Sequence, residues 1–296
     1  MSRAPVQAAL SALTLLALTA CGGDGAAPDS SAAVDPGDPA ACPGEVVDVV
    51  ASVAQWGSIA RQLGGDCATV TTIVASVAVD PHAFEPVTAD LAAFDRADLV
   101  VLNGGRYDAW ALEPASGAPA VVEATGLTAD GHADDDPHLW YDPAVVTQVA
   151  DAVTQQLTEL SPDAAPYFDA QRAAFAAELQ PLLDAVATLR AASDGRTYAA
   201  TEGVFDRMAA AVGLADATPA GDLAELESAL RDGEVDVLVL NRQTGGRVPE
   251  RIQEAAEDAD VPVVEVTESP PDDDGFFVEW QLAQLDELSD ALGVSP

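Results

Sequence analysis

The chain has 296 residues, of which 49% are hydrophobic, so it is long and apolar enough to fold around a sizeable core. Acidic residues outnumber basic ones by 50 to 12, all basic residues are arginine, and the net charge is −38. Such a charge repels phosphate backbones, which argues against nucleic-acid binding, and it concentrates cations near the protein. Because the acids are spread over the whole chain, they also fit a solvated surface suited to high salt.

The amino-terminal segment has the pattern of an export signal. A short apolar run at residues 8–18 is followed by Leu18-Thr19-Ala20-Cys21-Gly22, which resembles the lipobox of bacterial lipoproteins. We therefore expect residues 1–21 to act as a signal peptide and Cys21 to carry a lipid that anchors the protein outside the cytoplasmic membrane. An ordinary signal peptide with an incidental cysteine is the alternative. Residues 22–44, rich in Gly, Ala, Pro, Asp and Ser, predict a flexible tether.

Two cysteines are left once Cys21 is assigned to the lipid. Thiols outside the cytoplasm tend to oxidise, so a disulfide between Cys42 and Cys67 is predicted. Two buried free thiols are the alternative. A metal–thiolate site is disfavoured because the chain has no Cys-x-x-Cys spacing.

Strand and helix patterns alternate along the first half of the chain. Such alternation predicts βαβ units and a mostly parallel sheet. Asp142 and Pro143 have the residue types of a helix N-cap and first helical position. In chain order we predict a strand at 46–52, a helix at 55–63, a strand at 70–79, a helix ending near 94, strands at 99–102 and 120–122, and a helix from 143 to about 160.

A long helical pattern over residues 165–190 separates two halves with the same alternating logic. The expected architecture is α/β, with two lobes joined by this helix: residues 45–161, a connector at 162–192, and residues 193–296. In the second lobe we predict strands at 196–201, 235–240 and 261–267, and helices at 205–212, 223–230, 248–259 and 279–292.

Four residues are candidate metal ligands. His82 and His138, two of only three histidines, each follow an Asp-Pro pair, and Glu202 and Glu268 follow predicted strands. Ligands of open α/β sheets gather at the carboxyl ends of strands. Two imidazoles with two carboxylates suit Mn²⁺ or Zn²⁺. Each residue alone fits a turn, a cap or a solvated side chain, so the prediction depends on the combination.

With these motifs, residues 45–295 resemble the zinc/manganese-binding lipoproteins of ABC importers, known as the cluster A-I family. The resemblance is carried by Asp80-Pro81-His82-Ala83-Phe84-Glu85-Pro86, by Asn103-Gly104 with Trp110 beyond it, and by Asp136-Pro137-His138-Leu139-Trp140-Tyr141-Asp142-Pro143. It implies a metal held between the lobes by His82, His138, Glu202 and Glu268.

In the second lobe, Thr201-Glu202-Gly203 has the form of the family's manganese-type members, whereas many zinc-binding members have histidine there. Glu268 stands where the manganese type has aspartate, so Asp272, Asp273 or Asp274 is an alternative fourth ligand. Asn241 and Gln243 either support the ligands or cap the following helix. His132 lies where zinc members carry a histidine-rich loop, and a solvated loop histidine is the preferred interpretation. The metal expected is Mn²⁺ or Zn²⁺, with a modest preference for Mn²⁺.

The resemblance implies a monomer that captures the metal outside the membrane and passes it to a membrane permease driven by an ATPase, without catalysis. A secreted metallohydrolase is the first alternative, but it needs an open coordination position, and no His-Glu-x-x-His motif is present. An adhesin that uses metal only for stability is the second.

Overall fold

The computed structural model describes residues 42–76, 79, 84–128, 136–271 and 276–294. All of them belong to one compact unit, Asp35–Pro296. None of the helices in these ranges combines the length and the apolar character that crossing a membrane requires.

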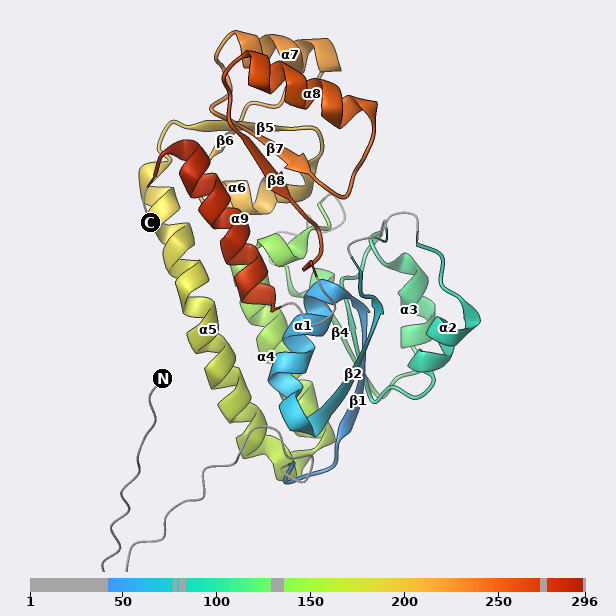
Figure 1. Ribbon diagram of the computed structural model, residues 1–296. Coiled ribbons are helices and arrows are strands. Elements are labelled where there is room, and N and C mark those ends of the chain that lie inside the picture. The colour runs from blue at the N-terminus through green and yellow to red at the C-terminus, as the bar shows by residue number, and fades with distance from the viewer. Residues whose placement is uncertain (1–41, 77–78, 80–83, 129–135, 272–275, 295–296) are drawn as a thin grey trace, which may run out of the picture. The chain divides into compact units, whose positions relative to one another are not determined.

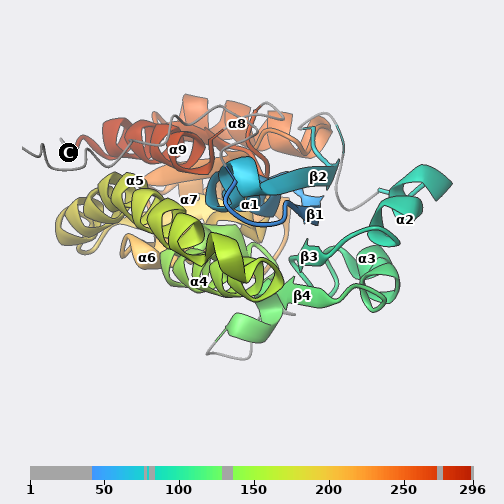
Figure 2. The same cartoon turned by 90° about the horizontal axis from the view of Figure 1, so that it is seen from below.

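The first half of the chain forms a parallel sheet with the strand order β2-β1-β3-β4. Alternate side chains of its central strands face opposite layers: Val50, Val100 and Leu102 pack towards α2 and α3, whereas Val49 and Val101 join the main core. Figure 1 and Figure 2 show α2 and α3 together on one side of this sheet. Its elements are β1 (Val47–Val53), α1 (Ala54–Gly64), β2 (Ala68–Val74), α2 (Thr88–Phe94), β3 (Leu99–Leu102), α3 (Ala109–Ala115) and β4 (Ala120–Glu123).

The second half repeats this topology with the strand order β6-β5-β7-β8, again all parallel. Leu238 and Leu240 pack with α7 and α8, while Val237 and Val239 join the main core on the other face. Its elements are β5 (Thr197–Ala200), α6 (Asp206–Ala211), β6 (Ala215–Asp216), α7 (Leu223–Arg231), β7 (Val237–Asn241), α8 (Arg247–Asp258), β8 (Val263–Val266) and α9 (Phe277–Leu292).

In chain order, α4 (Pro143–Leu160) and the long α5 (Ala165–Ala192) follow the first sheet, and α5 packs along α4, α1 and α9 on one flank of the molecule (Figure 1). Short 3₁₀ turns lie at Gly65–Cys67, Ala124–Leu127, Leu139–Tyr141, Pro162–Ala164 and Gly203–Phe205. One continuous hydrophobic cluster contains strand residues of both sheets and side chains of α1, α4, α5 and α9. The two sheets therefore share a core.

The predicted α/β architecture with a long helix between two sheets is confirmed. Asp142 caps α4, because its carboxylate accepts hydrogen bonds from the backbone N–H groups of Ala144 and Val145. The strand predicted at 70–79 was too long. It ends at Val74, since its partner β1 ends at Val53, where the chain turns into α1. Sequence reasoning also missed α3 and the two-residue β6.

Cys42 and Cys67 form a disulfide bond that closes a loop with a sequence separation of 25 residues. Both precede strands of the first sheet, β1 and β2, and so lie at the amino ends of those strands. In the chain-entropy description, a loop of this length restricts the unfolded chain enough to stabilise the fold by about 3 kcal/mol.

Replacing both cysteines by serine should therefore lower the free energy of unfolding by about 3 kcal/mol, measured by chemical denaturation. Metal binding should be retained, because the bridge lies at the edge of the sheet opposite the candidate ligands. Unchanged stability of the double variant would show that the cross-link does not restrict the unfolded chain.

Candidate metal centre

Polar side chains gather where the strands of both sheets end. Gln55 follows β1, Asn103 follows β3, Glu202 follows β5, Asn241 ends β7, and Glu268 follows β8. In parallel α/β sheets, the carboxyl ends of the strands are where ligands bind. The candidate centre is therefore built by five strands of two sheets.

A tight turn after β3 forms the part of the candidate centre that belongs to the first sheet. The fully buried Asp108 carboxylate accepts hydrogen bonds from the backbone N–H groups of Asn103 (2.8 Å) and Gly104 (2.7 Å) and from the Ser52 hydroxyl. Burial raises the pKa of Asp108, and these hydrogen bonds oppose that shift. Gly104 is required here, because its φ is +88° and an added Cβ would lie 2.3 Å from Glu123.

The Asn103 side chain connects this turn to the loop that carries His138. Its amide oxygen accepts from Trp56 Nε1 at 3.1 Å, and its amide nitrogen donates to the carbonyl of Pro137 at 2.9 Å. Because that peptide immediately precedes His138, the Asn103 turn positions the backbone of this candidate ligand.

His138 is buried, with 8% of its surface exposed, and Trp140 packs edge-on against its ring at 5.5 Å. Its Nδ1 lies 2.9 Å from Asp136 Oδ1, and its backbone N–H donates to the same oxygen at 3.1 Å. A carboxylate at Nδ1 selects the tautomer with hydrogen on that nitrogen and directs Nε2 towards a metal. The signature around His138 thus contains both the candidate ligand and the carboxylate that contacts its Nδ1.

Glu268 is 1% exposed, and groups from both halves of the chain hold it. Tyr107 donates to Oε2 at 2.9 Å, Asn241 donates to Oε1 at 2.7 Å, and Gln55 donates to the backbone carbonyl. Burial, and next the Glu268 carboxylate, raise the pKa of Tyr107, so its hydroxyl stays protonated and donates. Tyr107 also packs against His138, with a ring separation of 6.2 Å. Tyr107 therefore contacts His138 through its ring and Glu268 through its hydroxyl.

Glu202 lies just after β5, and its Oε1 is buried without a hydrogen-bond partner in the described part of the chain. It lines a cavity of about 220 Å³ together with the loop Thr244–Gly246 and the start of α8. A buried carboxylate oxygen without a hydrogen-bond donor lowers the stability of the folded protein. A bound cation would remove that cost.

Asn241 and Gln243 support the segment that carries Glu268. Asn241 bonds the carboxylate itself, and Gln243 Oε1 accepts from the backbone N–H of Ser269 at 3.1 Å. The Asn241 amide oxygen also accepts from the backbone N–H of Gln243 at 3.0 Å. Both residues therefore contact the loop that carries Glu268.

Among the described residues, no three His, Cys, Asp or Glu side chains converge as a ready metal cluster. The carboxylate oxygens of Glu268 are directed to Asn241 and Tyr107. His82, His132, the alternative ligands Asp272–Asp274 and the predicted lipid site Cys21 lie outside the described residues. Tyr107 contacts both His138 and Glu268, whereas Glu202 follows β5, which β7 separates from β8.

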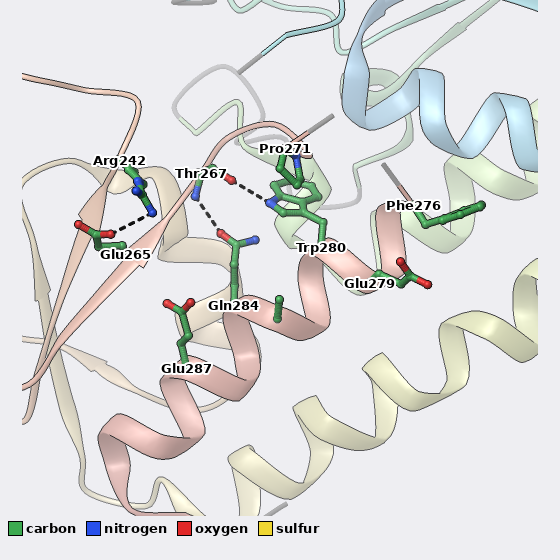
Figure 3. A pocket seen from close by; sticks show the side chains of 10 residues that line it. Arg242, Glu265, Thr267, Pro271, Phe276, Glu279, Trp280, Gln284 and Glu287 are labelled. Atoms are coloured by element: carbon green, nitrogen blue, oxygen red, sulfur yellow. Dashed lines mark hydrogen bonds and ion pairs between the residues drawn. The ribbon is translucent and has the colours of Figure 1, made fainter. Parts of the chain in front are cut away.

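A larger cavity, of about 380 Å³, lies between β8 and α9 (Figure 3), and the described candidates His138, Glu202 and Glu268 do not line it. Its wall is ordered by Thr267, whose backbone N–H donates to Gln284 at 2.9 Å and whose hydroxyl accepts from Trp280 at 2.9 Å. Arg242 and Glu265 form an ion pair at its rim, with 3.4 Å between the charged atoms. These contacts fix the strand end that leads into Glu268.

Sequence reasoning missed Tyr107, Asp108, Gln55 and Arg207, all of which contact the candidate centre or the residues that hold it. Tyr107 and Asp108 lie between Asn103-Gly104 and Trp110, so the turn motif marked their neighbourhood without revealing their roles. Nothing in the local sequence of Gln55 or Arg207 predicted contacts that span more than 70 residues.

Comparisons with known proteins agree with this architecture. A family model described as "Zinc-uptake complex component A periplasmic" matches residues 49–291. The high-affinity zinc uptake system protein ZnuA of Bacillus subtilis is 22% identical over 283 residues, covering 84% of this chain and 88% of that protein. The manganese-binding lipoprotein MntA of Halalkalibacterium halodurans is 28% identical over 153 residues, 47% of this chain.

The match to MntA spans about half of that relative's length, 48%. Among solved structures, a zinc-bound deletion mutant of ZnuA has a TM-score of 0.71 at 21% identity and covers 85% of this chain and 100% of its own. At this identity the likeness shows the shared fold. Because the family model covers most of the sequence, the protein belongs to the zinc-uptake complex component A family.

Proposed function

We propose that this protein binds one divalent transition metal ion, Mn²⁺ or Zn²⁺, outside the cytoplasmic membrane and delivers it to an ABC importer. The main support is that Tyr107 contacts both His138 and the buried carboxylate of Glu268. The Nδ1 atom of His138 is already engaged by Asp136. Family membership and the names of the zinc and manganese relatives support the class of ligand. The metal is cargo, so the role is binding and release without catalysis.

The proposed ligands are His138 through Nε2, the carboxylates of Glu202 and Glu268, and His82. Imidazole nitrogen and carboxylate oxygen suit both Mn²⁺ and Zn²⁺. Three of these side chains do not converge in the described structure, so metal capture requires the carboxylates to turn inward. For Glu268 this means exchanging a hydrogen bond from Tyr107 or Asn241 for the ion, while the other contact keeps the side chain in place.

The choice between the two metals depends on affinity and supply. A site with two histidines and two carboxylates binds Zn²⁺ more tightly than Mn²⁺ by the Irving–Williams order. Glutamate at position 202 matches the manganese-type pattern. Competitive titration with both ions, together with elemental analysis of the purified protein, would decide which one the protein carries.

The other parts of the chain would position the protein to deliver the metal. We propose that cleavage of the signal peptide before Cys21 removes residues 1–20, that a lipid on Cys21 anchors the protein, and that residues 22–44 form a flexible tether to the metal-binding part. Residues 45–161 and 193–296 would act as two lobes joined by the helix at 162–192, and a single copy would dock on the permease and its ATPase.

Substituting His138 by Ala should reduce metal affinity by more than the 10–100-fold typical of losing a residue that only supports a ligand. Glu202→Gln should also reduce it, because the amide keeps the shape but loses the charge. Glu159→Gln removes an exposed charge from α4 and is the control. Isothermal titration calorimetry measures the Zn²⁺ and Mn²⁺ affinities of the three variants.

Unchanged affinity in His138→Ala would contradict the proposed centre. Equal losses in Glu202→Gln and in the Glu159→Gln control would mean that net charge, and not coordination, governs binding.

Tyr107→Phe should lower the stability of the metal-free protein by about 1–3 kcal/mol, because Glu268 loses a hydrogen bond to a charged, buried oxygen. Saturating metal should restore part of this loss, since the ion replaces the missing donor. Thermal unfolding with and without Zn²⁺ tests this. An equal loss of stability in both states would show that Glu268 does not contact the metal.

A further inference from the structure

Arg207 on α6 reaches from the second half of the chain into the His138 signature of the first half. Its Nε and Nη2 donate to the backbone carbonyl of Asp136 at 3.2 and 2.8 Å, and its Nε also lies 3.0 Å from Asp136 Oδ2. Nη1 is 3.9 Å from the Asp142 carboxylate. The Arg207 side chain is 9% exposed, so these contacts, which we call the Arg207–Asp136 clamp, are largely buried.

The clamp and the candidate ligand His138 share the carboxylate of Asp136. Asp136 presents Oδ2 to Arg207 and Oδ1 to Nδ1 of His138, at 3.0 and 2.9 Å. A carboxylate held only by a histidine rotates easily about its side-chain bonds. With a planar guanidinium fixed on its second oxygen and on its own backbone carbonyl, Asp136 has one orientation, and so has the imidazole.

We propose that Arg207 is a positioning residue, which acts through Asp136 to hold His138 with Nε2 directed at the metal. The inference rests on the proposed function, because it assigns His138 as a ligand. Outer carboxylates of this kind orient metal-binding histidines, and their loss typically costs 10–100-fold in affinity.

The clamp joins the two halves of the chain, because Arg207 is carried by the second half and Asp136 by the first.

The test compares Arg207→Ala and Arg207→Lys with Arg172→Ala in the full-length protein. Arg172 is a matched control, because it pairs with Asp151 at 2.8 Å between α5 and α4, away from the strand ends. Zn²⁺ affinity and dissociation rate are measured by competition with a chromophoric chelator. Long-range ¹H–¹⁵N spectra report the tautomer of His138 without metal, and only three histidines contribute signals.

We expect Arg207→Ala to lose 10–100-fold in affinity, mainly through faster dissociation, and to show a mixture of His138 tautomers. Arg207→Lys should recover part of the affinity, and Arg172→Ala should bind as the unmodified protein does. Unchanged affinity in Arg207→Ala, or a weakened affinity with a single unaltered tautomer, overturns the proposal. If His138→Ala still binds metal, the proposed centre itself fails, so the two failures are distinguishable.

Discussion

The buried carboxylate of Glu268 is the constraint around which the two halves of this protein are arranged. A charged group that is 1% exposed is stable only if donors or a cation satisfy it. Tyr107 from the first half and Asn241 from the second each supply one hydrogen bond. Because Gln55 also binds its backbone carbonyl, the segment after β8 is held against the first sheet. The hydrophobic core shared by both sheets reinforces this attachment.

His138, which packs against the ring of Tyr107, is positioned by a series of hydrogen bonds. Asp108 orders the turn at Asn103, Asn103 bonds the peptide before His138, and Asp136 engages the imidazole Nδ1. Each group in this chain is held by another before any metal arrives. In the proposed centre the histidine side is therefore preorganised, whereas the carboxylate side would exchange hydrogen bonds for the ion. Rigidity on one side and exchangeable contacts on the other suit a protein that must bind and then release its cargo.

Local patterns predicted the repeated α/β halves, the long helix and the cap at Asp142, because hydrophobic period and turn chemistry are encoded within a few residues. The strand end at Val74 was not predictable, since it depends on where the partner strand stops. Tyr107 and Arg207 were missed because their contacts join residues 161 and 71 positions apart, which no local pattern reveals. The ligand set came from residue types at predicted strand ends and from the family resemblance.

The proposed centre places one metal ion between the halves, bound by residues of both. A crystal structure of the metal-loaded protein, with anomalous diffraction data at the absorption edges of zinc and manganese, would locate the ion and its ligands. We predict a single strong peak bonded to His138 Nε2 and to the carboxylates of Glu202 and Glu268, with His82 completing the set. A metal bound by residues of only one half, or a fully loaded protein in which Glu268 still bonds only Tyr107 and Asn241, would show that the ion is not held by residues of both halves.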